Sequence, residues 1–122
     1  MRLLIVEDSK IKIEWIRDIL KEKNIEYDEI TYLNGACLKI LDEPKVYDGI
    51  ILDMQFPIYK NGEIDERAGE KLLKRLKHRK INIPVLGNSS IDFQSLTEYP
   101  CLRGNTYGVF EPKVLNNFLE SL

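Results

Sequence analysis

Three acidic side chains follow directly on short apolar runs. Glu7 and Asp8 come after the run at residues 3–6, and Asp53 closes the run at residues 47–53. Such runs are typical of strands buried on both faces, where a carboxylate costs free energy unless it is paired, hydrated or bound to a metal. Taken singly, Asp8 is better explained as a helix cap and Asp53 as a turn residue. Together they indicate a shared site.

Apolar periodicity divides the chain into alternating strands and helices that would position these acids. Strands are predicted at residues 3–6, 27–33, 47–53, 81–86 and 106–110. Helices are predicted at residues 9–23, with Asp8 or Ser9 as the cap, at 34–43, with Asn34 as the cap, and at 67–79, 92–98 and 113–122. This alternation predicts one α/β domain over residues 1–122, a doubly wound five-stranded parallel sheet with helices on both faces.

Ligands of such a sheet collect beyond the carboxyl ends of its strands. If the strand order is 2-1-3-4-5, the first and third strands are neighbours, and Glu7, Asp8 and Asp53 converge. Ser89 follows the fourth strand and Glu111 the fifth. Three carboxylates in one place repel one another, and a divalent cation removes that repulsion. Because Mg²⁺ prefers oxygen ligands, a magnesium site is predicted here.

Two motifs around these acids resemble the receiver domain of bacterial response regulators. VEDS, at residues 6–9, looks like that family's acidic pair after the first strand. ILDMQFP, at residues 51–57, resembles its phosphoacceptor motif, in which an Asp at the end of the third strand is followed four residues later by Pro. Here these two residues are Asp53 and Pro57.

Two later motifs extend the resemblance over essentially the whole chain. IPVLGNSS, at residues 83–90, matches the family's fourth strand and places Ser89 where the family has a hydroxyl that contacts the phosphoryl group. Glu111 and Pro112 stand where the family has Lys-Pro. The resemblance implies a flavodoxin-like (CheY-like) fold with the strand order 2-1-3-4-5.

The resemblance also implies a role for each residue of the site. Asp53 would be the nucleophile that takes a phosphoryl group from a partner histidine kinase or phosphotransfer protein. Mg²⁺ would be held by Asp8, Asp53 and the backbone carbonyl of Gln55, with Glu7 acting through water. Ser89 would hydrogen-bond the phosphoryl group and act as the switch hydroxyl.

Two residues depart from the family's pattern. Glu111 replaces the Lys that pairs with the phosphoryl group, and a carboxylate there would repel phosphorylated Asp53 unless it turns away or joins the metal. Lys113 and Lys10 are the nearby cations that would have to compensate. Gly108 falls where the family carries an aromatic residue that rotates with the hydroxyl.

The segment after Pro57 is a further departure. Residues 58–66 are polar, lack an apolar period and lengthen the connection between Pro57 and Gly69, so we expect a long loop beside the acids. This loop would gate the site, offer a partner surface, or have no role, since loops tolerate extra length. By resemblance, the peptide bond before Pro112 is expected to be cis.

Composition narrows the range of partners. The 18 Lys and Arg against 20 Asp and Glu give a net charge of -2, which argues against direct nucleic-acid binding and against attraction to an anionic membrane. The first apolar run is too short for a signal peptide or a membrane helix, so a cytoplasmic location is expected. Cys37 and Cys101 lack metal-ligand spacing and are expected to be reduced.

Two functions stay open at this stage. One is a stand-alone phosphoacceptor receiver that signals through protein contacts, since no effector domain follows Leu122. The other is a degenerate receiver that acts as an interaction module without phosphorylation. An enzyme is not expected: haloacid dehalogenase-like phosphatases need an acid two residues after the nucleophile, where this chain has Gln55, and no glycine-rich nucleotide motif is present.

Overall fold

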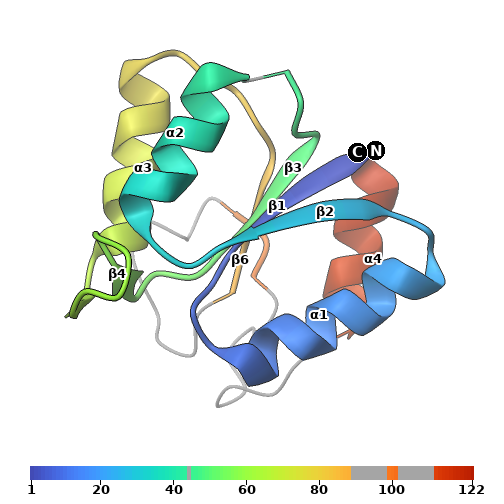
Figure 1. Cartoon of the computed structure of the whole chain (residues 1–122). Helices are drawn as coiled ribbons and strands as arrows, with labels where there is room; N and C mark the ends of the chain where they lie inside the picture. The colour runs from blue at the N-terminus through green and yellow to red at the C-terminus, as the bar shows by residue number, and fades with distance from the viewer. Residues whose placement is uncertain (44, 89–98, 102–111) are drawn as a thin grey trace.

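A four-stranded parallel sheet forms the centre of the computed structural model, which describes residues 1–43, 45–88, 99–101 and 112–122. Its strands lie in the order β2 (Glu26–Ile30), β1 (Arg2–Val6), β3 (Gly49–Leu52) and β6 (Val85–Gly87) (Figure 1). The order predicted for the first four strands is confirmed. The strand predicted at residues 106–110 and the helix predicted at 92–98 lie outside the described residues.

Helices cover both faces of this sheet. Helices α2 (Leu33–Asp42) and α3 (Ala68–His78) lie on one face, and α1 (Lys10–Glu22) and α4 (Pro112–Ser121) lie on the other (Figure 1). The predicted doubly wound arrangement is therefore confirmed. None of the helices in the described part of the chain is long and apolar enough to cross a membrane.

The central strand β1 shows why its sequence is continuously apolar. Leu3 and Ile5 pack in the cluster beneath α1 and α4, whereas Leu4 and Val6 pack in the cluster beneath α2 and α3. All four side chains are fully buried. Since successive side chains of a strand point to opposite faces, a strand covered on both faces requires an apolar residue at every position.

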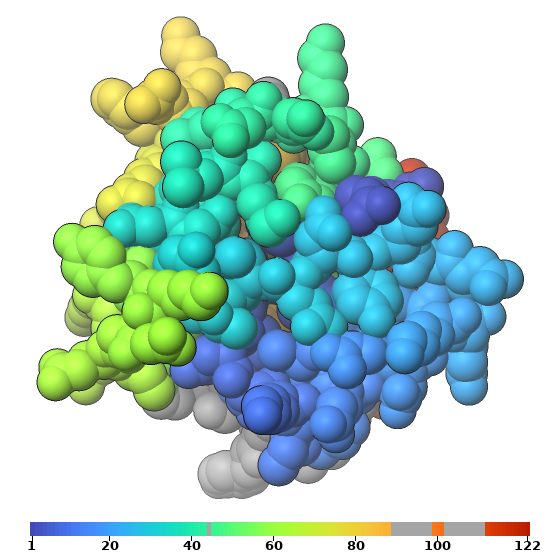
Figure 2. Space-filling model, in the orientation of Figure 1, coloured from blue at the N-terminus to red at the C-terminus, as the bar shows by residue number. Residues whose placement is uncertain are grey.

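The segment predicted as a long loop at residues 58–66 contains part of a small second sheet. Strand β4 (Phe56–Pro57) pairs antiparallel with β5 (Ile64–Asp65), so the loop expectation was wrong at Ile64 and Asp65. Two-residue strands are too short to show an alternating pattern in the sequence. This hairpin lies at one side of the molecule against α2 (Figure 2), and the Asn34 N–H donates to the carbonyl of Ile58 at 3.1 Å.

One predicted helix cap differs from the structure, and the other lacks a side-chain capping bond. Tyr32, not Asn34, precedes the first helical residue of α2, and Asn34 lies inside the helix, where its backbone binds the hairpin. Ser9 is the N-cap of α1 as expected, but its side chain makes no capping hydrogen bond. Its backbone N–H donates instead to Glu7 Oε1 at 3.1 Å. The start of α1 is thus coupled to the first acid.

Gly69, in the first turn of α3, presses this helix against the end of β3. Its N–H donates to the carbonyl of Met54 at 3.0 Å. A Cβ atom at this position would overlap the carbonyl oxygen of Asp53 and lie 2.8 Å from Met54 Cα. The backbone that carries Asp53 is therefore held in place by a contact that only glycine permits.

We predict that Gly69→Ala lowers the free energy of unfolding by about 1–2 kcal/mol, because the backbone overlap outweighs the gain of about 1 kcal/mol in helix propensity. Urea denaturation measures this change. Lys74→Ala, on the exposed side of the same helix, is the control and should change stability by less than about 0.5 kcal/mol. A Gly69→Ala protein as stable as the wild type would show that the contact of Gly69 does not constrain the backbone of Asp53 and Met54.

Candidate functional site

Glu7, Asp8 and Asp53 meet at the carboxyl ends of β1 and β3. Each offers a carboxylate oxygen, and these three oxygens lie within 4.8 Å of one another. The parallel register pairs Val6 with Leu52, so the residues that follow are brought side by side. The Asp53 N–H donates to the carbonyl of Val6 at 3.0 Å and extends this ladder by one bond. The convergence predicted from the sequence is present.

Two of the three carboxylates are buried and hydrogen-bonded. Glu7 is 1% exposed and Asp53 is 5% exposed. Glu7 accepts from the Ser9 N–H through Oε1, and from Asn88 Nδ2 through Oε2 at 3.3 Å. Asp53 Oδ1 accepts from the Met54 N–H at 2.8 Å. Backbone N–H groups close in sequence thus fix one oxygen of each side chain, Oε1 of Glu7 and Oδ1 of Asp53.

Asn88 is a member of the site that sequence reasoning missed. It follows β6 directly and is 1% exposed, and its N–H donates to the carbonyl of Leu52 at 2.8 Å. Its side-chain oxygen, Oδ1, has no hydrogen-bond partner among the described residues. A polar residue at a strand end, next to Ser89 in the motif at residues 83–90, is the signal that could have identified it.

Lys12 is the cation that the described residues contribute to the pocket, and it was also missed. Its Nζ lies 3.8 Å from Glu7 Oε1 and 3.9 Å from Asp53 Oδ1, and its side chain is 19% exposed. Lys12 is in the first turn of α1, and helical side chains tilt toward the N-terminus of their helix. A basic residue one turn after an acidic pair at a strand end is the signal that could have identified it.

Burial raises the pKa values of both buried acids. The pKa of Glu7 rises to about 8, first because burial penalises its charged form and then because Asp53 is close, while Lys12 and the Ser9 N–H act in the opposite direction. Burial likewise raises the pKa of Asp53, against the effects of Lys12, the Met54 N–H and a hydrogen bond with Glu7. Without a metal, Glu7 therefore holds a proton at neutral pH.

The donor set fits a hard divalent cation. Carboxylate oxygens are the ligands that Mg²⁺ and similar ions prefer, and the three oxygens are close enough to share one ion. Burial disfavours the charged forms of Glu7 and Asp53 and raises both pKa values, and a cation bound between them would favour those charged forms. The cluster could therefore hold a metal ion.

The other predicted site residues are only partly described. Gln55 lies in the connection between β3 and β4 with a half-buried side chain, and the role of its carbonyl stays a prediction. Ser89, Gly108 and Glu111 lie outside the described residues. Pro112 is the first residue of α4, but the peptide bond that joins it to Glu111, expected to be cis, lies outside them too.

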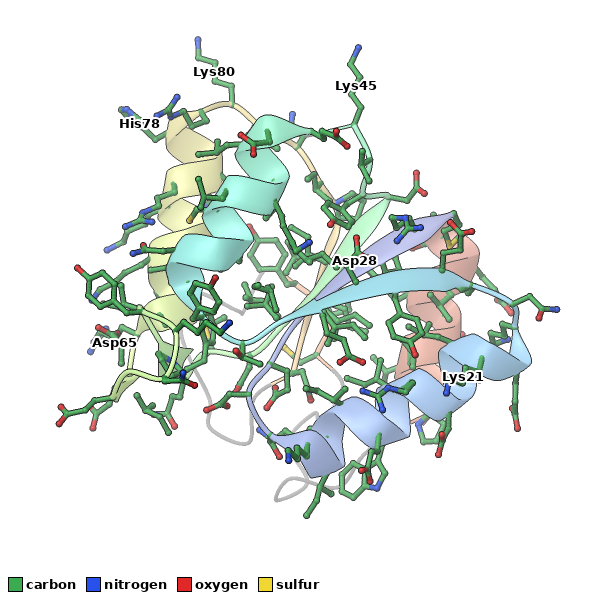
Figure 3. The ribbon with its side chains drawn as sticks, in the orientation of Figure 1. Lys21, Asp28, Lys45, Asp65, His78 and Lys80 are labelled. Atoms are coloured by element: carbon green, nitrogen blue, oxygen red, sulfur yellow. The ribbon has the colours of Figure 1, made fainter. Side chains whose placement is uncertain are left out.

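The exposed face of α3 and the two residues after it are rich in basic side chains: Lys71, Lys74, Arg75, Lys77, His78, Arg79 and Lys80. Figure 3 shows His78 and Lys80 at the end of α3 far from Asp65, which lies near the start of that helix. At the start, Lys71 Nζ pairs with Asp65 Oδ2 at 2.5 Å. These contacts are consistent with a solvated helix face.

We predict that, without divalent cations, the free energy of unfolding falls as pH rises from the ordinary Glu7 pKa of 4.5 to the raised value of about 8. The folded state holds the Glu7 proton more tightly than the unfolded state. The stabilisation that this proton contributes is therefore complete below pH 4.5 and is lost as the pH rises to about 8, by at most about 1.4 kcal/mol per pH unit.

Urea denaturation in chelator across this pH range measures the slope. Glu7→Gln should flatten it, because the amide does not titrate, whereas Glu22→Gln, at an exposed position of α1, should leave it unchanged. An equal slope in wild type and Glu7→Gln would contradict the assignment.

Comparison with known proteins finds similarity in structure only. No protein-family model matches the chain, and no curated protein matches its sequence. The receiver domain of Klebsiella pneumoniae RstA, in its BeF3-activated form, superposes with a TM-score of 0.72 at 20% identity, covering 99% of this chain and 97% of that one.

Two other solved structures are similar to this chain over nearly its whole length. A CheY-like receiver domain from Methylobacillus flagellatus gives a TM-score of 0.72 at 18% identity, with 99% of this chain and 97% of that chain covered. Vibrio cholerae CheY4, a chemotaxis protein, gives 0.71 at 18% identity, with 98% and 96% covered. The chain therefore has the fold of a CheY-like response regulator receiver domain.

Proposed function

We propose that this chain is a phosphoacceptor receiver in two-component signalling. Asp53 would accept a phosphoryl group from a histidine kinase or phosphotransfer protein in the cytoplasm, and the phosphorylated chain would signal by contact with another protein. The observation that carries this proposal is the buried Asp53 at the carboxyl end of β3, held beside Glu7 and Asp8 in a receiver fold.

The geometry around Asp53 favours a nucleophilic carboxylate. Its N–H is bonded to Val6 and its Oδ1 to the Met54 N–H, so its orientation is fixed before a donor arrives. A carboxylate oxygen attacks phosphorus, an oxygen–phosphorus bond forms, and the bond to the donor breaks with its electron pair leaving on the donor. Before a metal binds, the raised pKa of Glu7 favours its neutral form, which limits the repulsion felt by Asp53.

The proposed metal is Mg²⁺. Asp8, Asp53 and the backbone carbonyl of Gln55 would hold it, and Glu7 would act through water. When bound, Mg²⁺ neutralises negative charge on the transferring phosphoryl oxygens. Asp8, the most exposed of the three acids, is the ligand that an incoming ion meets with least desolvation.

The proposed response to phosphorylation involves the segment after β6. The Asn88 N–H is bonded to Leu52, the residue before Asp53, and the Gly87 N–H to Pro100 at 2.8 Å. Ser89 is next in the chain. If its hydroxyl moved toward the phosphoryl group, it would pull on the backbone of Gly87 and Asn88, which is hydrogen-bonded to Pro100 and Leu52.

The second candidate is a degenerate receiver that binds partners without phosphorylation. Two features of the sequence favour it: Glu111 replaces the expected Lys, and Gly108 replaces the expected aromatic residue. Under either candidate we propose that the chain is not an enzyme, because the position two residues after Asp53 holds Gln55 and not a general acid.

Incubation with Mg²⁺ and acetyl phosphate, followed by intact mass measurement, separates the two candidates. We predict a mass gain of one phosphoryl group in the wild type and none in Asp53→Asn, because an amide is not a nucleophile for this transfer. Asp18→Asn, at an exposed position of α1, is the matched control and should be labelled like the wild type. An unlabelled wild type, under conditions that label an ordinary receiver, would favour the degenerate candidate.

A further inference from the structure

The ammonium of Lys12 lies in the acidic pocket, a position that formation of helix α1 does not require. Its ammonium lies within 4 Å of both buried carboxylates, 3.8 Å from Glu7 and 3.9 Å from Asp53. Among the described residues, no other Lys or Arg forms an ion pair with either acid. Lys10 and Lys113, the cations that the sequence suggested, are both exposed.

The pocket needs such a charge once a phosphoryl group is present. A phosphoryl group on Asp53 adds negative charge to a cluster that already holds Glu7 and Asp8. The sequence places Glu111 where a receiver is expected to supply a lysine. A cation from elsewhere in the chain would therefore be required.

Backbone hydrogen bonds hold the helix turn that carries Lys12 beside the pocket. The Ile13 N–H is bonded to the carbonyl of Ser9 at 3.0 Å, and the Ser9 N–H to Glu7, so the first turn of α1 is fixed relative to the pocket. The long stem of lysine carries a compact charge with three donors. Oxygens attached to Asp53 through phosphorus would lie near this ammonium, because Oδ1 is already 3.9 Å away.

We propose that Lys12 supplies the positive charge that stabilises the phosphoryl group on Asp53, in place of the lysine absent at position 111. This inference rests on the proposed phosphoacceptor function. With an acyl phosphate as donor, a carboxylate oxygen of Asp53 bonds to phosphorus and the carboxylate of the donor leaves with the electron pair. Lys12 keeps its proton and forms no covalent bond.

The alternative is an ion pair that only stabilises the fold. The two roles differ in what they predict for binding of the phosphoryl group. The ammonium faces Asp53, a proposed metal ligand, and Glu7, which is proposed to act through water, so removal of its charge should tighten Mg²⁺ binding in either case. Only the proposed role predicts that the same change weakens binding of the phosphoryl group and slows its transfer.

The test compares wild type, Lys12→Gln, Lys12→Arg and Lys10→Gln, in which an exposed lysine of the same helix turn loses the same charge. Labelling by acetyl phosphate with Mg²⁺ is followed by intact mass. We expect Lys12→Gln to be labelled at least about tenfold more slowly, equivalent to about 1.4 kcal/mol, Lys12→Arg to remain within about threefold, and Lys10→Gln to match the wild type.

Two binding measurements complete the test. Calorimetry with Mg²⁺ alone should show tighter binding to Lys12→Gln, and titration with beryllofluoride in saturating Mg²⁺ should show weaker binding. Labelling of Lys12→Gln at the wild-type rate would overturn the role of Lys12 and leave the phosphoacceptor function standing. If the wild type is not labelled, the phosphoacceptor function fails. An unchanged beryllofluoride affinity in Lys12→Gln would also overturn the role of Lys12.

Discussion

Two carboxylates buried side by side impose the main constraint on this molecule. Glu7 and Asp53 are almost fully excluded from solvent, and Asp8 lies next to them. Charges of one sign in a low-dielectric environment must be balanced by a proton, a cationic side chain or a metal ion. The structure shows the second, in the ammonium of Lys12. The raised pKa of Glu7 favours the first, and the oxygen ligands suit the third.

The fold brings the acids together because β1 and β3 are parallel neighbours. Their register ends at Val6 and Leu52, so both chains leave the sheet at the same level. Helix α3 then closes on the end of β3 through Gly69, and β6 adds Asn88 from the other side. Strand order, register and one close backbone contact thus suffice to assemble a pocket from residues far apart in the chain.

Part of this could be predicted from the sequence. Continuous apolar runs located β1 and β3, and the acids at their ends indicated the cluster, because strand burial and strand-end position are local signals. Lys12 was missed because the direction of a helical side chain depends on how the helix crosses the sheet. Asn88, which follows β6, was missed because the neighbouring Ser89 matched the hydroxyl of the family's pattern. The β4–β5 pair was missed because its strands have two residues each. Ser89 and Glu111 lie outside the described residues, so their predicted roles stay predictions.

The charge balance of the pocket links stability to the proposed phosphorylation, since Lys12 and the raised pKa of Glu7 offset the burial of Asp53 and would also affect a phosphoryl group bound to it. Carbon-13 NMR of the Glu7 and Asp53 carboxyl carbons, titrated with pH in the absence and presence of Mg²⁺, tests this most directly. Without Mg²⁺ we predict that Glu7 titrates with a pKa of about 8, and that saturating Mg²⁺ lowers this pKa. A Glu7 carboxyl that titrates near its ordinary pKa of 4.5 without metal, and does not respond to Mg²⁺, would contradict it.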